Sequence, residues 1–218
     1  MMNKTKKLYF ILMADIIGSR QTEQQRLMVD FREIVNQTNI NAKEQLLSPI
    51  TITLGDEFQS VASNLSSALA IMFQLEESII MAGKDFKLRY VLMEGEIETP
   101  INKKIAYEML GSGLTEARAS LIELKNAKAR FYIAIKDKAL GNAINKAFVV
   151  LQRLIDDWNL NKDYYIVSKF LQHKDYKQVA SELNKERSLM WKREKSLKLE
   201  DYFALKEIVT YLGGNKDV

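Results

Sequence analysis

Two aspartates stand where this chain could hold a metal ion. Asp15 follows the apolar run Leu8–Ala14, which predicts a buried strand, and Asp56 lies in the tight turn of a predicted hairpin. If the two strands are neighbours in one sheet, both carboxylates emerge at the same edge. Carboxylate oxygens suit Mg²⁺, which fills its remaining positions with water and substrate phosphates. The spacing therefore predicts a site for Mg²⁺ or Mn²⁺, with the two carboxylates within about 7 Å of each other.

The segment after Asp15 could bind the phosphates of a ligand. It runs into a predicted helix, so its backbone N–H groups could face an anion. The segment consists of Ile16, Ile17, Gly18, Ser19 and Arg20. Ser19 is also a candidate N-cap of that helix. Each aspartate has a structural alternative as well: Asp15 could cap the helix, and the Gly55-Asp56 pair is favoured in hairpin turns for backbone reasons.

Composition excludes several other chemistries. The chain has 218 residues, of which 47% are hydrophobic and 28% charged, as in an ordinary soluble globular protein. It has no cysteine, which excludes disulfides, zinc fingers, iron–sulfur clusters and thiol catalysis. The single histidine, His173, cannot build a multi-histidine metal site. No signal peptide or membrane span is evident, so we expect a cytoplasmic protein that does not bind a membrane.

Hydrophobic periodicity predicts the elements that would position the aspartates. Strands are predicted over residues 8–14, 50–54, 57–61, 86–97 and 130–135, and helices over residues 20–47, 65–82, 115–127 and 137–158. The order β-α-β-β-α-β, followed by α-β-α, is a ferredoxin-like split βαβ arrangement with one added strand. We therefore expect an α/β (α+β) fold with a sheet-containing domain over residues 1–158.

The C-terminal part is predicted to be a small all-helical domain over residues 160–213, followed by a frayed tail over residues 214–218. Its periodic segments cover residues 164–172, 176–183, 187–199 and 201–212. The net charge of the whole chain is +4. From Lys185 to Lys198 there are six basic residues and two acidic ones. This local excess makes nucleic acid a candidate partner.

Residues 178–184 resemble the first helix and turn of helix-turn-helix modules. Asn184 would take the turn, because asparagine tolerates the left-handed conformation, and Met190 would anchor the next helix. That helix would present basic side chains to DNA phosphates or base edges, namely Arg187, Lys192, Arg193 and Lys195. Lys185 and Glu194 stand at positions that are normally apolar. The alternative is a helical lid or oligomerisation element whose basic face is solvated.

Two separated motifs resemble those of nucleotide-processing domains. Residues 14–18, Ala-Asp-Ile-Ile-Gly, and 53–58, Thr-Leu-Gly-Asp-Glu-Phe, are similar to the metal-binding signature of class III nucleotidyl cyclases and of GGDEF domains. The resemblance implies a cyclase-type sheet domain in which Asp15 and Asp56 bind the metals that hold a purine nucleotide. By context Arg118 resembles the transition-state arginine of cyclases. Leu114 stands where those enzymes usually place a ribose-positioning asparagine, so we do not expect efficient cyclization.

A broader resemblance covers nearly the whole chain. The blocks that carry it are Asp15–Arg20, Ile52–Gln59, Gly95–Thr99, Leu110–Gly113, Ala117-Arg118 and Met190–Leu197. Together they are similar to the bacterial SatD family. That resemblance implies a fold more securely than an activity.

The combined prediction is a cytoplasmic regulatory protein that acts as a dimer. Its first domain would bind Mg²⁺ with a nucleotide, and its second would contact DNA. Two alternatives stay open. One is a nucleotide phosphotransfer enzyme that uses Asp15 and Asp56 as Mg²⁺ ligands and Arg118 in catalysis. The other is a degenerate scaffold that binds neither ligand.

Overall fold

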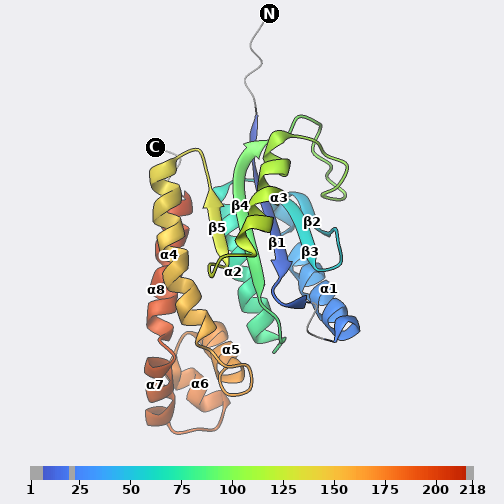
Figure 1. Ribbon diagram of the computed structural model, residues 1–218. Coiled ribbons are helices and arrows are strands. Elements are labelled where there is room, and N and C mark those ends of the chain that lie inside the picture. The colour runs from blue at the N-terminus through green and yellow to red at the C-terminus, as the bar shows by residue number, and fades with distance from the viewer. Residues whose placement is uncertain (1–6, 20–22, 215–218) are drawn as a thin grey trace, which may run out of the picture.

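A mixed five-stranded sheet with helices on both faces forms the centre of the protein (Figure 1). The computed structural model describes residues 7–19 and 23–214, so Arg20 and residues 215–218 of the predicted tail lie outside the described residues. The strands are β1 (Leu8–Ile16), β2 (Leu46–Ile52), β3 (Glu57–Ala62), β4 (Leu88–Glu96) and β5 (Phe131–Ala134). The helices are α1 (Gln24–Asn41), α2 (Leu65–Met81), α3 (Ser112–Leu124), α4 (Lys138–Asp156), α5 (Tyr164–His173), α6 (Tyr176–Glu182), α7 (Arg187–Ser196) and α8 (Leu199–Gly214).

The strand order is β2-β3-β1-β4-β5. The strand β1 is central and pairs antiparallel with β3 and β4, while β2 pairs antiparallel with β3. The strand β5 joins β4 in parallel, and α3 is the crossover between them. The predicted mixed fold with a five-stranded sheet and the predicted order of its elements are therefore confirmed.

Each face of the sheet has its own hydrophobic core. Leu12 and Ala14 of β1 face one core together with α1, α2 and α4, whereas Ile11 and Met13 face a smaller core under α3. Figure 1 shows α3 in front of the sheet and α1 and α2 behind it. Because successive side chains of a strand point to opposite faces, a central strand covered on both sides must be apolar throughout. This arrangement explains the unbroken apolar run before Asp15.

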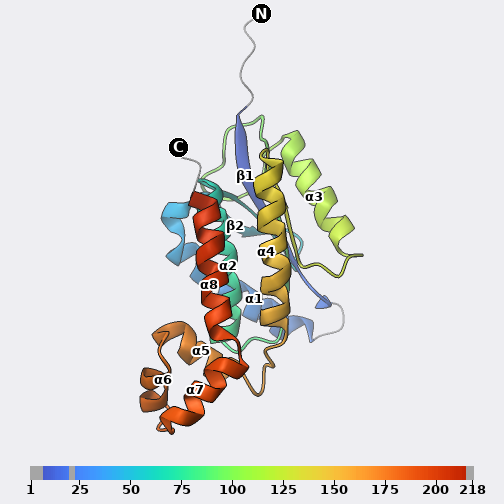
Figure 2. The same cartoon turned by 90° about the vertical axis from the view of Figure 1, so that its left-hand side faces the viewer.

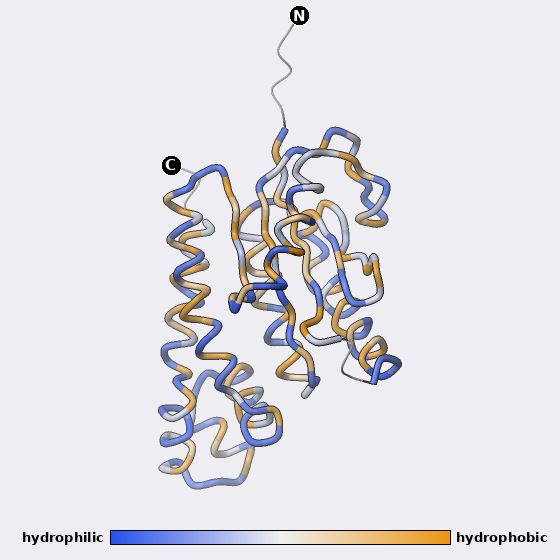
Figure 3. The backbone as a smooth tube through the Cα atoms, viewed as in Figure 1, coloured by the Kyte–Doolittle hydropathy of each residue, from blue (hydrophilic) through white to orange (hydrophobic). Residues whose placement is uncertain are grey.

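The four C-terminal helices share the larger core. The helix α8 contacts α2 and α4 along their length (Figure 2), and its residues Tyr202 and Val209 are buried. The tube of α4 alternates between polar and apolar along its length (Figure 3), as expected of a helix with one buried side. The indole N–H of Trp158 donates to the carbonyl of Leu197 at 2.9 Å. The sheet-containing part and the four C-terminal helices therefore share one hydrophobic core. The predicted boundary between two domains near residue 159 stays a prediction.

The segment between α1 and β3 differs from the sequence prediction. The helix ends at Asn41 rather than near residue 47, and β2 begins at Leu46 rather than at residue 50. The side-chain amide of Asn39 donates to the carbonyl of Ile50 at 2.8 Å and accepts from its N–H at 2.7 Å. Pro49 lies inside this edge strand, within the second of its two register shifts, between Ser48 and Thr51. An edge strand tolerates proline because the missing N–H faces away from the ladder.

Candidate functional site

Asp15 is a buried carboxylate near the end of β1, with 2% of its side chain exposed. The strand register places it opposite Glu57 of β3 and Arg89 of β4. Arg89 Nη1 lies 3.1 and 3.0 Å from the two carboxylate oxygens of Asp15, and Lys125 Nζ lies 3.2 Å from Oδ2. Burial raises the pKa of Asp15, and the charges of Arg89 and Lys125 oppose that rise. Two cations therefore compensate this carboxylate.

Asp56 comes to the same place from the β2–β3 turn. Its carbonyl accepts a hydrogen bond from the N–H of Ile16 at 2.9 Å, and its Oδ2 accepts one from the Ser19 hydroxyl at 2.6 Å. The structure thus brings both aspartates to one pocket of about 380 Å³. The pocket is lined by Asp15, Ile16, Gly18, Ser19, Asp56, Arg89 and Lys125.

The segment after Asp15 does not take the expected position at a helix N-terminus. The helix α1 begins only at Gln24, and its N-cap is Glu23 rather than Ser19. The N–H groups of Ile16 and Ile17 already donate to backbone carbonyls, so they are not free to bind a phosphate. Gly18 and Ser19 do line the pocket, and Gly18 has a φ of +72°. Ile16 also lines the pocket, but its N–H is already used, so Gly18 and Ser19 are the described residues of this segment that could still donate to a ligand.

Lys125, at the C-terminal end of α3, lines the pocket, and Arg118 of the same helix lies outside the pocket lining. They lie two helical turns apart, and both reach Glu57: Arg118 Nη2 is 3.0 Å from Oε2, and Lys125 Nζ is 3.3 Å from Oε1. Arg118 is half-exposed and also borders a second groove of about 560 Å³, to which Leu114 contributes. The arginine that resembles a transition-state group is therefore held by an ion pair beside the pocket.

Glycines allow α3 to lie directly on β4. A Cβ atom built on Gly113 would come within 2.6 Å of the Cα of Gly95, and one on Gly111 would come within 2.3 Å of the carbonyl oxygen of Glu96. Side chains at these positions would push the helix off the sheet. The glycines therefore set the distance between α3 and the sheet, and with it how far Arg118 and Lys125 extend toward Glu57 and Asp15.

Sequence reasoning missed Arg89, Lys125 and the role of Glu57. Arg89 had a detectable signal: it is a charged residue at the start of a strand that is otherwise apolar up to Glu94, which indicates a buried acidic partner. Lys125 had a weaker one, since it follows Arg118 at a spacing of two helical turns.

The residues present do not fit a resident Mg²⁺ ion in this arrangement. Oxygen donors of the right kind are available, but Arg89 and Lys125 occupy the oxygens of Asp15, and Ser19 donates to Asp56. No group of three or more acidic or histidine side chains is placed to hold a metal anywhere in residues 7–19 and 23–214. The predicted role of Asp15 and Asp56 as metal ligands stays a prediction.

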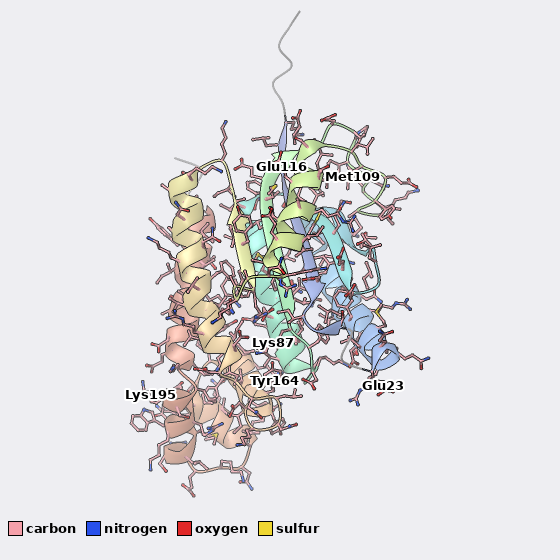
Figure 4. All side chains as sticks on the ribbon, in the orientation of Figure 1. Glu23, Lys87, Met109, Glu116, Tyr164 and Lys195 are labelled. Atoms are coloured by element: carbon pink, nitrogen blue, oxygen red, sulfur yellow. The ribbon has the colours of Figure 1, made fainter. Side chains whose placement is uncertain are left out.

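The basic residues of the C-terminal helices fall into two classes. Arg193 pairs with Asp163, and Lys195 pairs with Glu200. The other two predicted DNA contacts, Arg187 and Lys192, are exposed. Figure 4 shows Lys195 of α7 on the opposite side of the view from Glu23, which precedes α1, and none of the residues that line the pocket belongs to α7. Any ligand in the pocket and any partner at α7 would therefore bind separate surfaces.

The turn between α6 and α7 has two of the expected features. Asn184 has a φ of +49°, in the left-handed region, and Met190 is buried. The predicted departure is also present, because Glu194 is buried in α7. Burial raises the pKa of Glu194.

Comparison with known families gives one decisive match. The model described as the SatD family matches residues 9–212. The chain belongs to the SatD family. A search of curated protein sequences finds no match. No helix in the described part of this SatD-family chain is long and apolar enough to cross a membrane.

Two solved structures similar to the SatD-family chain are nucleotidyl cyclases. A bacterial light-regulated adenylyl cyclase aligns with 12% identity and a TM-score of 0.44, covering 58% of this chain and 76% of that one. The guanylyl cyclase Cya2 aligns with 11% identity and a TM-score of 0.36, covering 52% of this chain and 68% of that one.

Proposed function

We propose that this SatD-family protein is a regulatory protein that binds a phosphate-bearing ligand of nucleotide type in the Asp15–Asp56 pocket. The observation that carries the proposal is the pair of cations, Arg89 and Lys125, in a pocket that also contains the Ser19 hydroxyl. Cations and hydroxyl donors together are typical of phosphate recognition. The volume of about 380 Å³ falls within the roughly 300–1,000 Å³ usual for small-molecule sites.

A neighbouring cavity supports a ligand of nucleotide type rather than a free phosphate. This neighbouring cavity, of about 290 Å³, shares Ser19 and Asp56 with the Asp15–Asp56 pocket. It is lined in addition by Leu27, Met28, Leu54, Gly55 and the amide-bearing Gln24. Apolar walls with one amide suit a planar heterocycle with polar edges. A nucleotide could place its phosphate beside the cations and its base in this neighbouring cavity.

Binding is favoured over cyclization because the residues that would do the chemistry are incomplete. Leu114 provides no hydrogen bond to a ribose, and Arg118 is engaged with Glu57. The rival proposal is phosphotransfer with Asp15 and Asp56 as Mg²⁺ ligands. Incubation of ATP or GTP with Mn²⁺ should yield little or no cyclic product. Turnover that is abolished by Asp56→Asn would support the enzyme instead.

A thermal-shift screen tests the binding proposal. Ligand that binds the native state at about 100 times its Kd stabilises by about 2.7 kcal/mol, which is a rise in Tm of roughly 5–10 °C for a chain of this size. The screen compares purine nucleotides with the matching nucleosides, each with and without Mg²⁺. We expect shifts from the nucleotides and none from the nucleosides. The absence of a shift from every nucleotide would contradict the proposal.

We also propose that α6 and α7 contact duplex DNA, as a second function on a surface separate from the pocket. The left-handed turn at Asn184, the buried Met190 and the exposed Arg187 and Lys192 support it. Arg193 and Lys195 contribute less, because acidic residues already hold them. Contact with both half-sites of a DNA operator would need the dimer that the sequence predicts.

The salt dependence of DNA binding tests this second proposal. Each phosphate neutralised adds about 0.9 to the magnitude of the log–log salt slope. The double variant Arg187→Gln/Lys192→Gln should therefore weaken binding and flatten the slope by up to about 1.8. The control is Lys103→Gln/Lys104→Gln, which removes the same charge from an exposed loop before α3. Equal slopes for both variants, or no binding by the wild type at low salt, would contradict a role of α7 in DNA binding.

A further inference from the structure

We propose that Arg89 and Lys125 take the place of a divalent metal at Asp15, so that the pocket binds a nucleoside monophosphate without Mg²⁺. This inference rests on the proposed function, because it assumes that the pocket takes a phosphate-bearing ligand. It differs from a metal–triphosphate site in both the counterion and the charge of the ligand.

The position of Arg89 is the first argument. A single nitrogen, Nη1, lies 3.1 Å from Oδ1 and 3.0 Å from Oδ2 of Asp15. Nearly equal distances to both oxygens place this nitrogen between them, where an ion bound by both oxygens of a carboxylate would lie. Lys125 Nζ covers the outer side of Oδ2 at 3.2 Å and also contacts Glu57. A metal bound by both oxygens of Asp15 would have to displace Arg89.

Displacement of Arg89 is unfavourable because the pair is built into the sheet. Asp15 and Arg89 lie directly opposite each other on β1 and β4, and their side chains are 2% and 11% exposed. If a metal took the carboxylate, the guanidinium would stay in a nearly buried position without its partner, which is costly. Mg²⁺ also gives up its own water reluctantly. The two strands therefore hold the cation and the carboxylate together.

The cations keep donors for a ligand. A guanidinium has five N–H groups and an ammonium has three. Asp15 engages one nitrogen of Arg89, and the buried Nε has no hydrogen-bond partner among the residues that the structure describes. The Lys125 side chain is 40% exposed at the pocket. A phosphate in the pocket could accept hydrogen bonds from Lys125 while Arg89 stays on Asp15, and one from the Ser19 hydroxyl if that hydroxyl turns away from Asp56.

The charge balance favours a ligand of low charge. Among the described residues around the pocket, three carboxylates face three cations, so the cluster is neutral as it stands. The carboxylates are Asp15, Asp56 and Glu57, and the cations are Arg89, Arg118 and Lys125. A triphosphate without a metal would add about four negative charges in one place, whereas a monophosphate adds about two. Without Mg²⁺, the monophosphate is the better match.

Calorimetric titration of the full-length protein tests the inference. AMP, GMP, ATP and GTP are titrated in EDTA and again in Mg²⁺. We expect AMP or GMP to bind with the same Kd in both conditions and more tightly in EDTA than the corresponding triphosphate. Lys125→Gln should weaken monophosphate binding about tenfold, the loss of one charge-assisted hydrogen bond.

Two further variants keep the result interpretable. Lys128→Gln removes the same charge three residues further along the chain, at an exposed position, and should bind as the wild type does. The double variant Asp15→Asn/Arg89→Gln removes both charges of the buried pair without leaving either one unpaired. It should fold, as circular dichroism would verify, and should lose monophosphate binding.

The outcomes separate this inference from the proposed function. Binding that requires Mg²⁺ and disappears in EDTA would overturn the inference and leave the proposed function intact. Unchanged binding by Lys125→Gln would also overturn it. If none of the four nucleotides binds in either condition, both the proposed function and the inference are wrong.

Discussion

Two buried pairs between an arginine and a carboxylate lie on opposite sides of β4, and they use their donors differently. In the first, Arg130 presents two nitrogens to the two oxygens of Glu76, at 3.1 and 2.9 Å. Arg130 Nη1 also donates to the carbonyl of Leu88 at 2.7 Å, and Nη2 lies 3.2 Å from Asp156. Both side chains are almost fully buried, with 5% and 10% exposed. Arg130 thus engages both terminal nitrogens, while its buried Nε, like that of Arg89, has no hydrogen-bond partner among the described residues.

The second pair, Arg89 with Asp15, is open on one side. Here a single nitrogen contacts both oxygens, and a pocket adjoins the pair. The same two residue types therefore form a structural contact when the fork of the arginine is matched by the carboxylate, and a ligand-accessible one when it is not. An arginine–carboxylate pair thus indicates a functional site only together with a pocket that adjoins it.

The largest expected effect comes from breaking the pair of Arg130 and Glu76. Arg130→Met leaves Glu76 buried without its main counterion, and should lower the free energy of unfolding by about 3–5 kcal/mol. For a chain of this size that is a fall in Tm of roughly 6–20 °C, which calorimetry or urea denaturation would measure. The double variant Arg130→Met/Glu76→Leu should regain most of the loss, because it removes the buried charge as well. A double variant no more stable than the single one would show that the packing of Arg130, not its charge, matters.

Breaking the open pair should cost less. Arg89→Met leaves Asp15 with Lys125 as a counterion, and the pocket admits water. We expect a loss of about 1–3 kcal/mol, smaller than that of Arg130→Met measured under the same conditions. Nucleotide binding should be lost together with Arg89. A loss of stability equal to that of Arg130→Met would mean that the two pairs serve the same structural role.

The same contrast explains what the sequence could and could not predict. The five strands and most helices follow local periodicity, and the apolar run before Asp15 correctly indicates a central strand. The pairing of Asp15 with Arg89 depends instead on the register between β1 and β4, whose partners are 74 residues apart. No local pattern specifies that register.

The β1–α1 segment shows a second limit. The helix α1 begins four residues later than expected. The N–H groups of Ile16 and Ile17, which the sequence predicts to bind a phosphate, donate instead to the carbonyls of Asp56 and Lys87. Those bonds join segments far apart in the chain. Local capping signals, which favoured Ser19, cannot reveal that Asp56 is the partner of its hydroxyl.

A third buried carboxylate extends the comparison to a site without a close cation. Burial raises the pKa of Glu194, the charge of Glu200 adds to the rise, and that of Lys195 opposes it. The ammonium of Lys195 pairs with Glu200 instead. Because the folded-state pKa lies above the ordinary value of 4.5, the ionised carboxylate lowers stability above that pKa. The cost is relieved as the pH falls through it.

Replacement of this carboxylate should therefore stabilise the protein at neutral pH. We expect Glu194→Gln to raise the free energy of unfolding by about 1 kcal/mol at pH 7, or Tm by roughly 2–4 °C. The gain should shrink as the pH falls through the folded-state pKa, because wild-type Glu194 is then neutral as well. Glu207→Gln removes the same charge from an exposed position on α8 and should give neither the gain nor its pH dependence. An increase in the free energy of unfolding that stays constant down to acidic pH would mean that the packing of this side chain, rather than its charge, limits stability. The buried carboxylate of Glu194 would then not need a counterion.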